Sequence, residues 1–156
     1  LDFGISNEGY YGDVAMTYPV GEIPKDVQRL LDVTESSLHK GINEAREGNR
    51  LYDISSAVQT HVEEAGFSIV REFVGHGIGR SLHEDPQLPN YGLKNTGIRL
   101  KAGMTFAIEP MVNMGRNEIY IKENGWTAAT KDGSLSAHFE HTVLITGNGP
   151  EILSKP

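Results

Sequence analysis

Apolar residues recur with two different periods along this chain of 156 residues, and the change of period divides it into three parts. Residues 1–20 are rich in aromatic and branched side chains and form two extended segments, which predicts two strands. From Pro24 onward, apolar residues return every three or four positions, which predicts a long helix that ends near Gly48. Asp53 is then expected to be the N-cap of a second helix, which Gly66 stops.

The third part is expected to consist mainly of strands. The strand-like segments cover residues 68–74, 104–112, 118–124, 126–130, 137–146 and 151–154, with a glycine-dense loop from Gly75 to Gly92. Strands, two helices and then a run of strands predict an α+β fold with an antiparallel or mixed sheet and helices on one face. The length fits a single domain, residues 1–156, with a hydrophobic core.

Composition narrows the classes of function. The formal net charge is −7, and an acidic surface argues against nucleic acid as the main partner, because phosphate binding needs clustered Lys and Arg. No apolar run approaches the roughly 20 residues that a membrane span requires. The chain has no cysteine, which excludes disulfides and thiolate metal sites and fits a reducing compartment. We therefore expect a cytoplasmic protein that uses carboxylates, imidazoles or hydroxyls.

Four carboxylates stand out by their position. Asp2 and Asp13 lie on what are expected to be adjacent strands; either one alone would more commonly be a solvated edge or turn residue. Glu109 and Glu140 interrupt apolar strands, where an ionised carboxylate is costly unless a cation neutralises it. Pairing with Lys or Arg is the alternative, but these strands carry few basic residues. A metal site is therefore the favoured interpretation.

A histidine between two glycines adds a candidate nitrogen ligand. His76 has Gly75 and Gly77 on either side, which lets a metal or substrate approach the imidazole, and His83 follows seven residues later. The His83 segment is not the helical HExxH zinc motif, because Pro86 would break the helix and Gln87 replaces the second histidine.

Together these residues predict a metal-dependent hydrolase. Four carboxylates and one imidazole suit hard or borderline divalent ions such as Mn, Fe(II), Co or Zn, and two such ions neutralise four carboxylates in formal charge. A two-metal site activates water near neutral pH and polarises a carbonyl group.

The motifs resemble those of the bacterial-type (type I) methionine aminopeptidases, which have the pita-bread fold. Five ordered motifs over nearly the whole chain carry the resemblance: Asp2 with Asp13, GHGIGR-x-x-HE-x-P with PNYG (75–92), AIEPM (107–111), GW (125–126) and HFEHT (138–142). The resemblance implies removal of the initiator methionine from nascent or short peptides, with ribosome proximity in the cell. The acidic composition and the lack of a long apolar run already predict neither nucleic-acid nor membrane binding.

The resemblance also implies roles for individual residues. Asp2 would chelate one of two divalent ions, Asp13 and Glu140 would bridge both, and His76 with Glu109 would complete the second. Glu109 would also carry the proton of the attacking water.

Three further side chains are expected to contact the substrate. His83 would contact the scissile peptide and stabilise the tetrahedral intermediate, while Leu82 and Trp126 would border the methionine pocket. Bulky aromatic residues are common in the family at the position of Leu82.

One expectation concerns the length of the whole protein, and two alternative functions remain open. The chain is expected to be the C-terminal part of a longer peptidase, whose N-terminal lobe would supply most of the methionine pocket. One alternative function is an X-Pro aminopeptidase or dipeptidase of the same fold. The other is a non-catalytic pita-bread module that binds protein partners.

Overall fold

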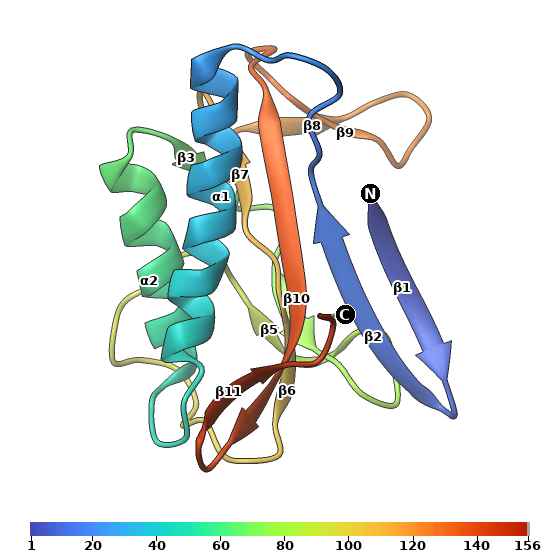
Figure 1. Cartoon of the computed structure of the whole chain (residues 1–156), viewed down its shortest axis with the longest axis vertical. Coiled ribbons are helices and arrows are strands. Elements are labelled where there is room, and N and C mark those ends of the chain that lie inside the picture. Colours follow the sequence, from blue (N-terminus) through green and yellow to red (C-terminus); the bar gives the residue numbers. More distant parts are fainter. Residues whose placement is uncertain (156) are drawn as a thin grey trace.

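The computed structural model describes residues 1–155, which form a nine-stranded antiparallel sheet with two helices on one face and a separate two-stranded sheet of β8 and β9 (Figure 1). The strands are β1 (Asp2–Asn7), β2 (Tyr10–Met16), β3 (Ser68–Ile69), β4 (Gly75–Gly77), β5 (Glu84–Leu88), β6 (Thr105–Ile108), β7 (Met111–Asn113), β8 (Ile119–Ile121), β9 (Ala128–Thr130), β10 (Ser136–Thr146) and β11 (Gly149–Ile152). The helices are α1 (Lys25–Glu44) and α2 (Leu51–Glu64). The predicted α+β layout is confirmed.

Both helices begin and end near the predicted residues. Pro24 directly precedes α1, where its fixed φ and missing N–H are no disadvantage. The helix α2 starts three residues earlier than predicted, at Leu51, so Arg50 and not Asp53 is the N-cap. Asp53 lies in the first turn instead, and its Oδ2 accepts a hydrogen bond of 2.7 Å from the backbone N–H of Arg50.

The strand β10 is the centre of the sheet. The main path of the sheet runs β1-β2-β10-β6-β4-β5, while β7 and β11 also pair with β10, and every pairing within residues 1–155 is antiparallel. Side chains alternate between the two faces of such a strand. Phe139, Val143 and Ile145 therefore share one face, and Glu140 and Thr142 share the other.

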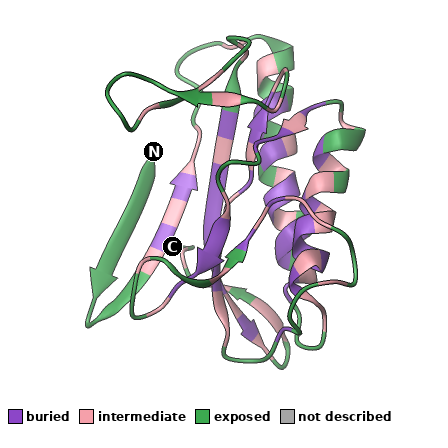
Figure 2. Ribbon diagram, turned by 180° about the vertical axis from the view of Figure 1, so that it is seen from behind, coloured by how far each residue is buried: buried purple, intermediate pink, exposed green. Residues whose placement is uncertain are grey.

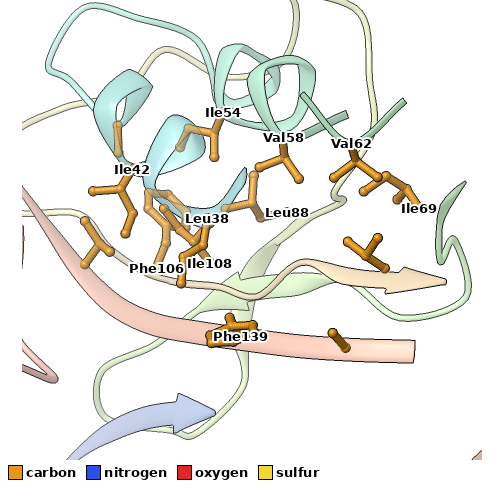
Figure 3. Close-up of a cluster of buried hydrophobic side chains, with 14 of the residues drawn as sticks. Leu38, Ile42, Ile54, Val58, Val62, Ile69, Leu88, Phe106, Ile108 and Phe139 are labelled. Atoms are coloured by element: carbon orange, nitrogen blue, oxygen red, sulfur yellow. The ribbon is translucent and has the colours of Figure 1, made fainter. Parts of the chain in front are cut away.

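The hydrophobic core fills the space between the helices and the first of these faces (Figure 3). Gly41 lets the helices approach closely, because a Cβ there would meet Val58 Cγ2 at 2.7 Å. The labelled core residues are Leu38, Ile42, Ile54, Val58, Val62, Ile69, Leu88, Phe106, Ile108 and Phe139. The core thus supports one face of the sheet and leaves the opposite face for the polar residues.

The middle of the chain departs from the prediction in three places. Of the strand predicted over 68–74, only β3 (Ser68–Ile69) forms. The predicted glycine-dense loop contains two short strands, β4 and β5. These two strands pair with each other, and β4 also pairs with β6. The strand predicted over 104–112 is divided into β6 and β7 by Glu109 and Pro110.

The hairpin of β1 and β2 lies at the edge of the sheet. Figure 2 shows β1 exposed along its whole length, whereas most of β10 is buried. Within residues 1–155, neither helix is both long and apolar enough to cross a membrane.

Candidate metal centre

The register of three strands brings acidic residues to the face of the sheet opposite the helices. Asp2 pairs with Ala15, and Ala15 pairs with Glu140, so Asp2 and Glu140 belong to one row across β1, β2 and β10. Asp13 lies two positions from Ala15 and therefore points to the same face. Residues far apart in the sequence thus converge through strand pairing.

A histidine joins these carboxylates from the other side of β10. His76 of β4 pairs with Ala107 of β6, and Ala107 pairs with Thr142 of β10, which places the His76 imidazole on the acidic face. Each of Asp13, His76 and Glu140 offers a donor atom within 4.8 Å of the others, and all three residues are buried. Two carboxylates and one imidazole at this separation fit a single bound cation.

The tautomer of His76 suits metal binding. Its Nδ1 lies 2.9 Å from the carbonyl oxygen of Gly77, and a carbonyl can only accept, so Nδ1 carries the proton. The lone pair of Nε2 is therefore free, and Nε2 faces the carboxylates. Hydrogen bonding of the second ring nitrogen to a backbone carbonyl is a recurrent feature of histidines that bind metals.

Glu109 approaches the cluster at the break between β6 and β7. Its Oε1 lies 3.3 Å from Nε2 of His76. Its main chain is held by Asn90, which is buried and donates a hydrogen bond of 3.0 Å from Nδ2 to the carbonyl oxygen of Glu109. Asn90 therefore helps to fix the backbone at the break between β6 and β7.

Burial leaves the two glutamates with strongly raised pKa values. Burial is the main cause for both: it raises the pKa of Glu109 to about 8 and that of Glu140 to about 9, and the charges of neighbouring acids add to the shift. The pKa of Asp13 is also raised, again mainly by burial and then by Asp2. Without a cation, the centre therefore holds carboxyl groups that resist ionisation at neutral pH.

The glutamates lack the basic partners that would make them ordinary buried ion pairs. Within residues 1–155, neither Glu109 nor Glu140 has a Lys or Arg nitrogen within 4.0 Å. Glu140 Oε1 is buried without any hydrogen-bond partner. The unsatisfied carboxylate oxygen of Glu140 and the free imidazole nitrogen of His76 are donor atoms that could bind a divalent cation.

A cleft of about 300 Å³ opens beside the cluster. Its lining residues are Asp2, Phe73, Val74, His76, His83, Glu109, Met111 and His138. Asp2 is exposed and lies outside the close group of three donors, although it shares their face of the sheet. The ring of His83 packs edge-on against that of His76, with 4.4 Å between centroids.

The two residues expected to border a methionine pocket lie at different distances from the centre. Leu82 covers Gly4, where an added Cβ would lie 3.1 Å from Leu82 Cδ1 and 3.9 Å from Asp13 Oδ1. Trp126 lies in the loop between β8 and β9, is 79% exposed, and is not among the residues that line the cleft. The assignment of Trp126 to a pocket stays a prediction.

Among the titratable residues that line the cleft, sequence reasoning missed His138. His138 Nε2 lies 3.8 Å from Glu109 Oε2 and is buried without a hydrogen-bond partner. The signal was present, because His138 stands two positions before Glu140 on β10 and must share its face.

Comparison with known proteins agrees with this geometry. Residues 1–147 match the profile of metallopeptidase family M24. Methionine aminopeptidase 1 of Bacillus subtilis (strain 168) is 55% identical over 155 residues, which are 99% of this chain and 62% of that protein. A methionine aminopeptidase of Clostridium perfringens is 52% identical over 154 residues, with the same coverage. The chain thus spans about three-fifths of the length of the curated relatives it matches.

Solved structures show the same architecture. The methionine aminopeptidase of Thermotoga maritima superposes with a TM-score of 0.98 at 54% identity, over 99% of this chain and 62% of that one. A prolidase from Pyrococcus furiosus gives a TM-score of 0.74 at 25% identity, over 99% and 40%. The expected pita-bread fold is confirmed, and the chain belongs to metallopeptidase family M24.

Proposed function

We propose that this chain carries the metal centre of an aminopeptidase that removes N-terminal methionine from nascent or short peptides. The observation that carries the proposal is the convergence of Asp13, His76 and Glu140, whose donor atoms lie within 4.8 Å of one another beside an open cleft. The names of the relatives at 52–55% identity supply the reaction and the substrate.

Two divalent ions, of Co, Mn, Fe(II) or Zn, would be held by Asp2, Asp13, His76, Glu109 and Glu140. When bound, they would supply a Lewis acid for the peptide carbonyl and a water of lowered pKa. Asp13 and Glu140 would bridge the two ions, because their strands β2 and β10 lie between β1 on one side and β6 and β4 on the other. Asp2 comes from β1, His76 comes from β4, and Glu109 directly follows β6.

The protein side chains would transfer the proton of the attacking water and contact the substrate. Glu109 lines the cleft, so its carboxyl group is placed to take a proton from the attacking water and to return it. His83 lines the same cleft and packs against His76, so it can donate a hydrogen bond to the carbonyl oxygen of a bound peptide. Leu82 and Trp126 remain the proposed walls of the methionine pocket.

Other parts of the expectation stay predictions. They are the completion of the pocket by an N-terminal lobe, proximity to the ribosome, and a cytoplasmic location. They concern the whole protein, and the activity is accordingly to be measured on the natural full-length protein.

The test compares two substrates and one variant. Full-length protein supplied with Mn²⁺ or Co²⁺ should release methionine from Met-Gly-Met-Met faster than it cleaves a Gly-Pro peptide, and Glu140→Gln should abolish the release. Faster cleavage of the proline peptide would favour an X-Pro peptidase instead. Failure to cleave either peptide in the presence of bound metal would favour a non-catalytic module.

A further inference from the structure

The strand β10 changes partner beside the metal centre. On one edge, Phe139–His141 pair with Val14–Met16 of β2, and Val143–Thr146 then pair with Gly149–Ile152 of β11. Thr142 occupies the junction. Its backbone already faces the C-terminal segment, since its N–H donates to Ser154 Oγ at 3.1 Å and its carbonyl accepts from the N–H of Leu153 at 2.9 Å.

The side chain of Thr142 closes the gap that this change of partner opens. The backbone N–H of Asp13 donates to Thr142 Oγ1 at 2.8 Å, and the same hydroxyl donates to the carbonyl oxygen of Asp13 at 2.8 Å. Both residues are buried: Thr142 is 2% exposed and Asp13 is 8% exposed. One hydroxyl therefore satisfies both backbone polar groups of Asp13 in place of the strand ladder.

The carboxylate of Asp13 is bonded to the backbone beside it. Asp13 Oδ1 accepts a hydrogen bond of 3.1 Å from the N–H of the next residue, Val14. The carboxylate donor atom must also reach within 4.8 Å of donors on His76 and Glu140, which belong to two other strands. A shift of the Asp13 peptide away from β10 would widen that group.

We propose that Thr142 is a positioning residue, whose hydroxyl holds the Asp13 carboxylate in place for binding of a divalent cation. The inference rests on the proposed function, because it presumes that Asp13 is a metal ligand. Partners behind a metal ligand commonly change metal affinity 10- to 100-fold when they are removed, and Thr142 acts on the backbone of its ligand from a neighbouring strand.

The chain offers a matched control at the other end of the same strand pairing. Thr17 Oγ1 donates to the carbonyl oxygen of His138 at 2.9 Å, and the N–H of His138 donates back to Thr17 Oγ1 at 2.9 Å. Thr17, the residue after β2, thus makes the same double contact to a backbone as Thr142, but to a residue outside the proposed ligand set.

The test compares Thr142→Val, Thr142→Ser and Thr17→Val in the full-length protein. Valine keeps the shape of threonine and removes the hydroxyl, so both valine variants should melt at a lower temperature without metal. The Kd for Mn²⁺ from titration calorimetry should rise about 10- to 100-fold in Thr142→Val only. It should stay within about threefold of wild type in Thr142→Ser and Thr17→Val, because serine keeps the hydroxyl and Thr17 holds no ligand.

The outcomes separate this inference from the proposed function. A wild-type protein that binds no Mn²⁺ would overturn the proposed function itself. Wild-type binding with an unchanged Kd in Thr142→Val, or an equal rise in Thr17→Val, would overturn the role of Thr142 alone.

A second measurement needs no valine variant. In metal-free wild-type protein labelled with ¹⁵N, the amide of Asp13 should exchange slowly with solvent because it is buried and bonded to Thr142. Rapid exchange of that amide, or a tenfold rise of the Kd in folded Thr142→Ser, would contradict the proposal even if Thr142→Val failed to fold.

Discussion

Nε2 of His76 and Oε1 of Glu109 lie 3.3 Å apart, so the short strand β4 and the break after β6 present their donors to each other across the cleft. The imidazole nitrogen is free to bind because Nδ1 donates to Gly77. The carboxyl group has a raised pKa because it is buried. Both groups gain a favourable partner when a cation binds between them, and the metal-free centre should be correspondingly sensitive to pH.

Without metal, the protein should become less stable as the pH rises from 7 to 8.5. The pKa is about 8 for folded Glu109 and about 9 for folded Glu140, against an ordinary value of 4.5. Over this range the unfolded chain has therefore lost protons that the folded chain still partly retains. Burial lowers the pKa of His76 and His138, which acts mainly below their ordinary value of 6.5. Calorimetric melting in EDTA should therefore show a falling melting temperature.

Added Mn²⁺ should reverse this trend. Metal binding requires ionised carboxylates, so the rise in melting temperature on adding Mn²⁺ should be larger at pH 8.5 than at pH 7. A melting temperature in EDTA that rises over the same range would contradict the assignment of raised pKa values to these glutamates.

Glu140→Gln should weaken the affinity for Mn²⁺ and reduce the pH dependence of stability in the metal-free protein. The amide keeps the size of the side chain but removes the charge, so the Kd for Mn²⁺ should rise about 100-fold or more. The fall in metal-free stability between pH 7 and 8.5 should shrink, because one raised carboxyl group is gone. Glu151→Gln, on the exposed side of β11, removes the same charge and should change neither quantity.

His83→Ala should retain metal and lose rate. His83 lines the cleft but lies outside the group of three donors, so the Mn²⁺ content should be that of wild type. The kcat for Met-Gly-Met-Met should fall about 100-fold or more, as for loss of a donor that stabilises a developing charge. His61→Ala is the control: His61 bonds to Ser36 between the helices, and its loss should affect stability only. Loss of metal in His83→Ala would show that it acts as a ligand.

Gly77→Ala should displace the His76 strand. A Cβ at Gly77 would lie 2.6 Å from the backbone oxygen of Asp85, which a side-chain rotation cannot relieve. The expected cost is about 1–3 kcal/mol of unfolding free energy, with a weaker affinity for Mn²⁺. Gly147→Ala is the matched control, because the nearest atom to its Cβ would be Glu47 Oε2 at 4.0 Å. Equal urea midpoints for the two variants would contradict the tight packing of β4 on β5.

Much of the centre could be predicted because the cost of burying charge is visible in a sequence. Glu109 and Glu140 stand in apolar strands, and His76 stands between glycines, so each required an explanation before any coordinates were known. The structure brings Asp13, His76 and Glu140 together and places Glu109 beside them.

Features that depend on long-range pairing were harder to predict. The strands β4 and β5 lie inside a glycine-rich segment, where they pair with each other, and β6 provides a second partner for β4. No local sequence pattern predicts that β6 is this partner. His138 and Thr142 were missed, although the alternation of side chains along β10 places both on the face of Glu140. Their contacts depend on β2 and on Glu109, which lie far from them in the sequence.

The central claim is that this face of the sheet binds divalent cations at Asp13, His76 and Glu140. The most direct measurement is anomalous diffraction at the manganese edge from crystals of the full-length protein grown with Mn²⁺. We predict anomalous peaks within bonding distance of Asp13, Glu140 and His76 Nε2, and their loss in Glu140→Gln. Ordered side chains at these positions without a peak, in crystals that contain Mn²⁺ elsewhere, would contradict the account.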